Sequence, residues 1–197
     1  MNSKEKITAI ILSGGKSTRM GTEKGLTKLN GKFLIEHIVD VVKKVTDEII
    51  IVANSSDYDV FGYKVFSDII KNCGQMGGIY TGLYYSKTKK NIVLSCDIPF
   101  VSSEAVKYIL DNSENSEITV PVHNDKLESL CAVYKKQCAE KLKLLLTKKI
   151  YKMTDAIKYF KLKTFDVSEQ KFYSEKLFSN INSKNELLKA QEFANEN

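Results

Sequence analysis

Residues 7–25 have the sequence ITAIILSGGKSTRMGTEKG, and the remainder of the chain is organised around them. The first six, ITAIIL, are mostly apolar and rich in β-branched side chains, which predicts one buried β-strand. The Ser13-Gly14-Gly15 turn that follows can expose several backbone N–H groups, and such a concave set of donors commonly binds phosphate. Three cations follow within the next ten residues: Lys16, Arg19 and Lys24. The segment therefore predicts a strand that ends in a phosphate-binding loop.

Arg19 is the only arginine among the 30 lysines and arginines of the chain. A planar guanidinium binds phosphate oxygens through two parallel hydrogen bonds and stays charged at all accessible pH values, whereas a lysine ammonium is a single charged point. If any positive charge sufficed at this position, a chain so rich in lysine would need no arginine there. We therefore predict that Arg19 binds phosphate and acts in catalysis. The alternative is an exposed arginine without a function.

The loop matches neither of the two commonest phosphate-binding motifs. A P-loop requires glycine where Ile10 stands, and the glycines at 14, 15, 21 and 25 do not have the G-x-G-x-x-G spacing. Residues 12–24 instead follow the pattern L-x-G-G-x-S-x-R-M-G-x-x-K. This pattern resembles the signature loop of the molybdenum cofactor guanylyltransferases, in the molybdopterin nucleotidyltransferase family. The resemblance implies an α/β protein with a Rossmann-like three-layer nucleotidyltransferase fold and a mostly parallel central sheet.

Strand-like and helix-like patterns alternate along the chain, as in a parallel sheet covered by helices on both faces. Strands are predicted at residues 7–12, 48–54, 63–66, 91–95, 117–122, 127–134 and, at an edge, 162–167. Helices are predicted at residues 33–45, 79–86, 102–109, 137–149, 153–160 and after Ser183, where a capping box begins the last helix. The sequence HNDK at residues 123–126 predicts a hairpin turn.

Length and composition favour a single soluble domain spanning residues 1–197. The net charge of +6 suits a polyanionic ligand such as a nucleotide, but the lysines do not alternate with aromatic residues as in a nucleic-acid groove. No apolar stretch approaches the roughly 20 residues needed to cross a bilayer, and the N-terminal residues do not have the pattern of a signal peptide. The four cysteines lie far apart, which disfavours a zinc site. We expect a cytoplasmic enzyme that binds neither nucleic acid nor membranes.

Asp97 follows the predicted strand at residues 91–95. Open α/β sheets bind their ligands at the carboxyl ends of the strands, and a carboxylate buried there without a partner would be costly. Mg²⁺ typically takes one or two protein carboxylates and completes its shell with water and substrate phosphates. We therefore predict that Asp97 is a Mg²⁺ ligand and a catalytic residue. It also matches the metal-binding aspartate that the resemblance implies.

The resemblance further implies a nucleotide site and an acceptor site. The implied nucleotide-binding residues are Leu12, Ser13, Gly14, Gly15, Lys24, Asn54, Asp68 and Asp97. The N-x-N sequence Asn180-Ile181-Asn182 implies two acceptor-binding residues, Asn180 and Asn182, although Asn182 could instead be an ordinary helix-entry residue. We expect these two asparagines to lie apart from the nucleotide site. The chain departs from the family pattern at Val52 and at Gln75-Met76.

The activity implied by the resemblance is transfer of GMP from GTP to the terminal phosphate of molybdopterin, which forms the guanine dinucleotide cofactor and releases pyrophosphate. A phosphate monoester is already an anionic nucleophile, so catalysis requires only positioning and charge neutralisation, for which Arg19, Lys24 and Asp97 are the predicted catalytic residues. The alternatives are CTP as donor, a sugar phosphate as acceptor, or a nucleotide-binding module without catalysis. The partners expected are GTP, molybdopterin and, transiently, proteins that deliver molybdopterin or mature molybdoenzymes.

Overall fold

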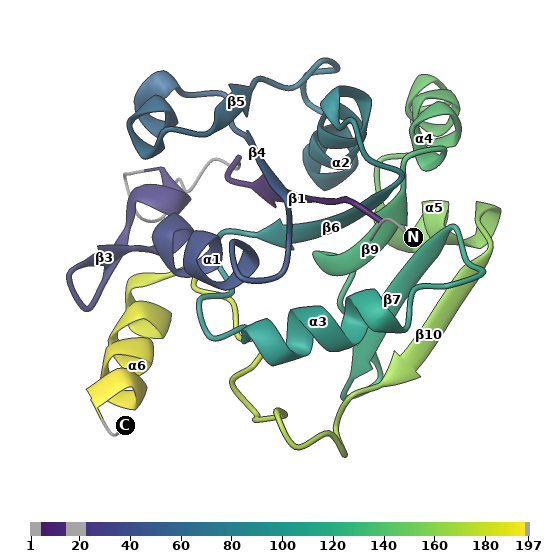
Figure 1. The fold of residues 1–197 in the computed structure, drawn as a ribbon. Helices are drawn as coiled ribbons and strands as arrows, with labels where there is room; N and C mark the ends of the chain where they lie inside the picture. The colour runs from purple at the N-terminus through teal and green to yellow at the C-terminus, as the bar shows by residue number, and fades with distance from the viewer. Residues whose placement is uncertain (1–4, 15–22, 196–197) are drawn as a thin grey trace.

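The computed structural model of the protein describes residues 5–14 and 23–195 (Figure 1). Gly15 and Arg19 therefore lie outside the described residues. The main sheet has the strand order β10-β7-β9-β6-β1-β4-β5, and β8 pairs with β7 beside it. Its strands are β1 (Ile7–Leu12), β4 (Glu48–Val52), β5 (Lys64–Phe66), β6 (Lys90–Ser95), β7 (Ile118–His123), β8 (Lys126–Leu127), β9 (Cys131–Lys135) and β10 (Leu162–Asp166).

Helices and short hairpins connect these strands. The α-helices are α1 (Leu34–Val42), α2 (Gly74–Tyr85), α3 (Ser103–Asp111), α4 (Cys138–Thr147), α5 (Met153–Ala156) and α6 (Lys184–Asn195). Three 3-10 turns, η1 (Lys24–Leu26), η2 (Ser56–Phe61) and η3 (Ile157–Tyr159), and the small hairpin of β2 (Lys28–Leu29) and β3 (Lys32–Phe33) complete the described structure. No helix in the described parts of the chain is long and apolar enough to span a membrane.

β1 lies in the centre of the sheet and pairs in parallel with both β4 and β6. β5 continues the parallel arrangement beyond β4, whereas β9 runs antiparallel between β6 and β7. The carboxyl ends of β1, β4, β5 and β6 therefore meet at one edge of the sheet. The predicted α/β fold with a mostly parallel central sheet is confirmed.

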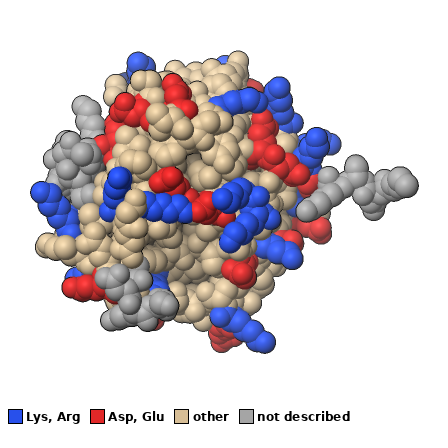
Figure 2. Space-filling model, turned by 60° about the vertical axis from the view of Figure 1, so that its left-hand side comes forward, with Lys and Arg blue, Asp and Glu red and all other residues tan. Residues whose placement is uncertain are grey.

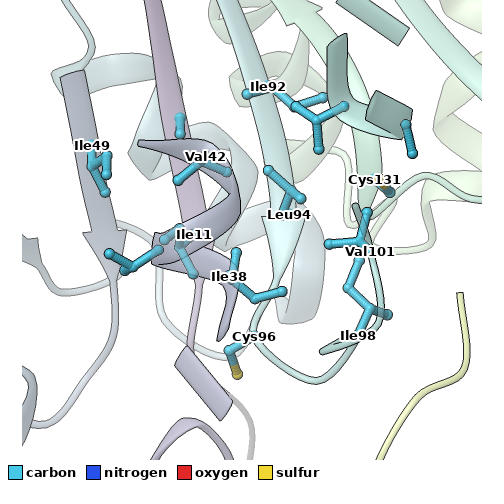
Figure 3. Close-up of a cluster of buried hydrophobic side chains, with 14 of the residues drawn as sticks. Ile11, Ile38, Val42, Ile49, Ile92, Leu94, Cys96, Ile98, Val101 and Cys131 are labelled. Carbon is cyan, nitrogen blue, oxygen red and sulfur yellow. The ribbon is translucent and has the colours of Figure 1, made fainter. Parts of the chain in front are cut away.

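The helices cover both faces of the sheet, with α1 and α3 on one face and α2, α4 and α5 on the other (Figure 1). Successive residues of β1 point to opposite faces, so Ile11 packs in the cluster with α1 while Ile10 packs against α2. Figure 3 shows Ile11 close to Ile38 and Val42 of α1. Because β1 is apolar on both faces, its sequence reads as a continuous hydrophobic run.

The last helix, α6, returns to the beginning of the chain. It packs beside the β2–β3 hairpin, where Ala190 and Ile181 join Leu29 and Leu34 in a small separate core (Figure 1). The capping box predicted at its start is present in part, because the Ser183 hydroxyl accepts a hydrogen bond from the backbone N–H of Glu186. This packing brings the segment before α6 to the carboxyl edge of the sheet.

Some predicted boundaries were wrong. α2 begins at Gly74, five residues before the prediction, and α1 ends at Val42 rather than at residue 45. The strand predicted at 127–134 is broken into β8 and β9, because Pro121 on β7 has no backbone N–H with which to continue the ladder. The helix predicted at 153–160 is α5 followed by η3.

The predicted hairpin at residues 123–126 is confirmed. Asn124 and Asp125 have φ angles of 47° and 58°, as the two central residues of a type I′ turn require. The edge strand predicted at 162–167 is β10, which pairs in parallel with β7.

Candidate active site

A cavity of about 790 Å³ opens at the carboxyl edge of the sheet, where β1, β4 and β6 end. Of the predicted site residues that the structure describes, all but one line this cavity: Leu12, Gly14, Lys24, Asn54, Asp68, Asp97, Asn180 and Asn182. Ser13 is fully buried beneath it. The structure therefore brings together residues that lie up to 170 positions apart in the sequence.

Asp97 lies between two residues that belong to the core. Cys96 and Ile98 are 2% and 3% exposed, and Figure 3 shows them in the cluster formed with α1 and β6. Asp97 itself is only 4% exposed. Its Oδ2 atom lies 2.5 Å from Lys24 Nζ, while the buried Oδ1 atom has no hydrogen-bond partner among the described residues. Such an oxygen at the wall of a polar cavity is available to a ligand.

This arrangement fits a divalent metal that is bound together with a phosphate ligand. Asp68 Oδ1 is a second buried oxygen at the cavity for which the described structure provides no partner. Groups of three or more His, Cys, Asp or Glu that could enclose a metal are absent from residues 5–14 and 23–195. Mg²⁺ does not need such a group, because it usually takes one or two carboxylates and obtains its remaining ligands from water and phosphate. Asp97 Oδ1 meets that requirement.

Lys24 contacts residues of both predicted sets, the nucleotide-binding residues and the acceptor-binding residues. Its Nζ donates hydrogen bonds to Asp97 Oδ2 and to Asn182 Oδ1. The expectation that Asn180 and Asn182 lie apart from the predicted nucleotide-binding residues was therefore wrong, because both sets line the same cavity. The backbone adds a second link, since the N–H of Ile181 donates to the carbonyl oxygen of Asp97 at 2.9 Å.

The Asn182 backbone is fixed in turn by α6. Its N–H donates to Glu186 Oε2 at 2.7 Å, and this hydrogen bond is the main reason why the pKa of Glu186 lies below its ordinary value. Asn182 is thus both a helix-entry residue and a residue of the cavity. The two interpretations of the N-x-N sequence do not exclude each other.

Asp68 and Asn54 form a second polar pair at the cavity. The Asn54 amide donates to Asp68 Oδ2 at 3.0 Å, and its carbonyl oxygen accepts from the Asp68 backbone N–H at 3.1 Å. These reciprocal bonds orient Asp68 and leave its other carboxylate oxygen for a ligand. Gly78 permits this close packing, because an added Cβ would lie 3.2 Å from Leu12 and 3.8 Å from Asp68 Oδ1.

The glycine-rich sequence GQMGG at residues 74–78 forms the N-terminal turn of α2 at the cavity wall. Gly74, Gln75 and Gly78 line the cavity, so the positive end of the helix dipole lies beside it. Met76, one of the departures from the family pattern, is fully buried and packs in the core of this helix face. This departure therefore changes the core, whereas Gln75 changes the surface that a ligand would contact.

The structure adds functional candidates that the sequence patterns did not reveal. Glu23 lines the cavity, and the fully buried Tyr58 contacts both Glu23 and Ser13. Tyr58 lies in a polar segment without a motif, so no sequence signal indicated its position. Cys96 also lines the cavity, but burial raises the pKa of its thiol to about 12, which keeps it protonated and unsuited to act as a nucleophile.

The described residues on one face of the molecule carry charges of both signs. On the face shown in Figure 2, lysine side chains are interspersed with aspartates and glutamates. A nucleic-acid groove would instead place positive charges along a continuous track.

A mostly parallel sheet with a polar cavity at its carboxyl edge, a helix N-terminus and a buried carboxylate paired with lysine is typical of nucleotide-binding α/β proteins. The family model described as "MobA-like NTP transferase domain" matches residues 9–161, and the chain belongs to this family of nucleotidyltransferases. The family resemblance drawn from residues 12–24 is thereby confirmed.

Individual relatives agree with this assignment. A "Probable molybdenum cofactor guanylyltransferase" of Flavobacterium johnsoniae is 34% identical over 184 residues, which cover 93% of this chain and 95% of the relative. A protein of the same name from Natranaerobius thermophilus is 34% identical over 96% of this chain and 97% of its own. The crystal structure of "Molybdopterin-guanine dinucleotide biosynthesis protein A" from Archaeoglobus fulgidus has a TM-score of 0.83, with 23% identity over 96% of this chain and 100% of that chain. This structural similarity supports the shared fold.

Proposed function

We propose that this protein transfers GMP from GTP to the terminal phosphate of molybdopterin, forming the guanine dinucleotide cofactor and pyrophosphate. Its family membership and the names of its relatives support the donor and the acceptor. The observation that best supports the proposed reaction is the position of Lys24 Nζ, which contacts Asp97 on one side and Asn182 on the other. One cation thus lies between the implied nucleotide residues and the implied acceptor residues.

The nucleoside is proposed to bind at Asp68 and Asn54. The unpartnered Asp68 Oδ1 can accept a hydrogen bond from an N–H of guanine or from a ribose hydroxyl. Asn54 keeps that carboxylate oriented through its two hydrogen bonds. Gly14 offers backbone without a side chain at the same wall, where an added Cβ would have open space except for Asn54 at 4.0 Å.

The triphosphate is proposed to lie between the N-terminal turn of α2 and Asp97. Asp97 would hold Mg²⁺ through Oδ1, and the bound ion would supply charge neutralisation for the phosphates. Lys24 Nζ neutralises the α-phosphate. Gly15 and Arg19, which lie outside the described residues, are proposed from the sequence pattern to bind the β- and γ-phosphates, which leave as pyrophosphate.

The reaction itself needs no protein nucleophile. An oxygen of the acceptor phosphate attacks the α-phosphorus, a new P–O bond forms, and the bond to the β-phosphate oxygen breaks with its electron pair leaving on pyrophosphate. Asn180 and Asn182 can hold the acceptor by hydrogen bonds without adding negative charge beside the triphosphate. Catalysis then consists of aligning two polyanions and neutralising their charge.

A panel of GTP, ATP, CTP and UTP, each with Mg²⁺, tests the nucleotide. GTP should raise the melting temperature most, because ligand binding to the native state stabilises it. Pyrophosphate release that requires both GTP and molybdopterin would then support the complete reaction. Stronger protection by CTP would contradict the guanine assignment, and protection by GTP without pyrophosphate release would favour a binding module.

A further inference from the structure

Tyr58 is fully buried on η2, between β4 and β5, and the reaction described above does not use it. Its Oη atom donates to the carbonyl oxygen of Ser13 at 3.1 Å and lies 3.4 Å from Glu23 Oε2. Ser13 follows β1 directly, and Glu23 directly precedes the η1 turn. One phenol group therefore contacts two segments that both lead to the cavity.

The backbone of the η1 turn also packs tightly against the same phenol. A Cβ added to Gly25 would lie 2.8 Å from Tyr58 Oη and 2.9 Å from Tyr58 Cε1. Distances this short leave room only for glycine at position 25. The neighbouring residue, Lys24, directs its side chain to Asp97 at the cavity. The position of Lys24 thus depends on how the turn rests on Tyr58.

The Tyr58 hydroxyl contributes a hydrogen bond in addition to its packing. A phenylalanine would occupy the same volume, and burying a hydroxyl is unfavourable unless it forms a hydrogen bond. Burial raises the pKa of Tyr58 above its ordinary value, so the group stays protonated and can donate. The shorter distance assigns the hydroxyl hydrogen to the Ser13 carbonyl, with the Glu23 carboxylate as the second acceptor.

We propose that Tyr58 is a positioning residue that holds the end of β1 and the η1 turn together, so that Lys24 Nζ is held at Asp97. The role of Tyr58 in placing the turn is supported by its contacts and does not depend on the proposed function. Its consequence for catalysis rests on the proposed function. The two parts can be measured separately.

The first measurement needs no ligand. Hydrogen exchange is followed in Tyr58→Phe at the amides of Leu26 and Thr27, which donate to the carbonyls of Glu23 and Lys24 in the η1 turn. We expect exchange at least about fivefold faster than in the wild type, the effect of losing one ordinary hydrogen bond. The second measurement is the dissociation constant of GTP with Mg²⁺ by calorimetry, which should rise by a similar factor.

Tyr134→Phe is the matched control. Tyr134 is also fully buried, and its hydroxyl donates to a backbone carbonyl, that of Ser129, at 2.8 Å. Both variants should lose similar stability, but only Tyr58→Phe should change exchange in η1 and GTP affinity. Equal effects of both variants, or no effect of Tyr58→Phe on η1, would overturn the proposal. Faster η1 exchange in a protein whose wild type binds neither GTP nor CTP would refute the proposed function and leave the Tyr58 inference standing.

A second variant keeps the test decisive if Tyr58→Phe does not fold. Gly25→Ala leaves the hydroxyl in place and pushes the turn away from the phenol, so it should accelerate η1 exchange as well. Exchange in η1 that is unchanged by Gly25→Ala would contradict the close contact between the turn and the phenol.

Discussion

Asp97→Asn separates the role of Asp97 in the site from its role in folding. The substitution keeps the shape of a side chain that is 4% exposed and removes its charge. It weakens the ion pair with Lys24, but it also removes the cost of burying a charged oxygen without a partner in the described structure. Because the amide oxygen can still accept a hydrogen bond from Lys24, we expect a net loss of about 1–2 kcal/mol, or roughly 2–8 °C in Tm for a chain of this length.

The effect on activity should be much larger than the effect on stability. A neutral amide is a poor replacement for a carboxylate as a ligand of Mg²⁺, which is a hard cation. Without the proposed ion, less of the charge on the transferred and departing phosphates would be neutralised. We expect kcat to fall by at least about 100-fold, which corresponds to about 2.7 kcal/mol.

The assay is pyrophosphate release from GTP and molybdopterin across a range of Mg²⁺ concentrations, at a temperature where circular dichroism shows the variant to be folded. Asp40→Asn is the control, because Asp40 also pairs with lysines, Lys32 and Lys43, but on the outside of α1. The control should retain wild-type turnover. Full Mg²⁺-dependent turnover in Asp97→Asn would refute the assignment of Asp97 as a metal ligand. Equal losses in both variants would show that the position of the carboxylate is irrelevant.

Three further substitutions test other parts of the site and the core. Arg19→Lys should lower kcat by about tenfold or more, equivalent to about 1.4 kcal/mol, with Tm nearly unchanged; wild-type turnover would reduce Arg19 to a surface residue without a role. Asn182→Ala should weaken GTP binding in calorimetry by more than about twofold because it contacts Lys24, whereas unchanged affinity would mean that this contact has no energetic consequence. Gly82→Ala should destabilise the protein by about 1–3 kcal/mol in urea unfolding, since the new Cβ would lie 2.2 Å from Ile10 Cγ2. Stability equal to wild type would show that α2 can move away from β1 at little cost.

The elements that the sequence predicted best are those with a strong local pattern. β1 was predicted with its observed ends, because a continuous β-branched run between polar residues has few alternatives. The start of α2 was missed because glycines at 74, 77 and 78 have low helix propensity, although packing of Met76 and Ile79 in the core holds that turn in the helix. Tertiary packing overrode a local preference there.

The site residues divide in the same way. The position of Asp97 at the cavity was predictable, because the strand before it has a clear pattern and the carboxyl end of a strand is where such sheets bind ligands. The position of Tyr58 at the site was not predictable, because it depends on contacts with Ser13, 45 residues earlier in the chain, and Glu23, 35 residues earlier. The sequence around position 58 contains no pattern that predicts those contacts.

That residues 1–197 form a single domain stays a prediction.

The contact between Lys24 and Asn182 predicts that the two proposed substrates affect each other's binding. It joins residues that are 158 positions apart, and it exists because α6 packs on the β2–β3 hairpin close to η1. Because the Lys24 ammonium group contacts both Asp97 and Asn182, any movement of this group on nucleotide binding would also change its contact with Asn182. If the proposed function holds, binding of the two substrates should therefore be coupled, and α6 should influence nucleotide binding through Asn182, whose backbone N–H donates to Glu186.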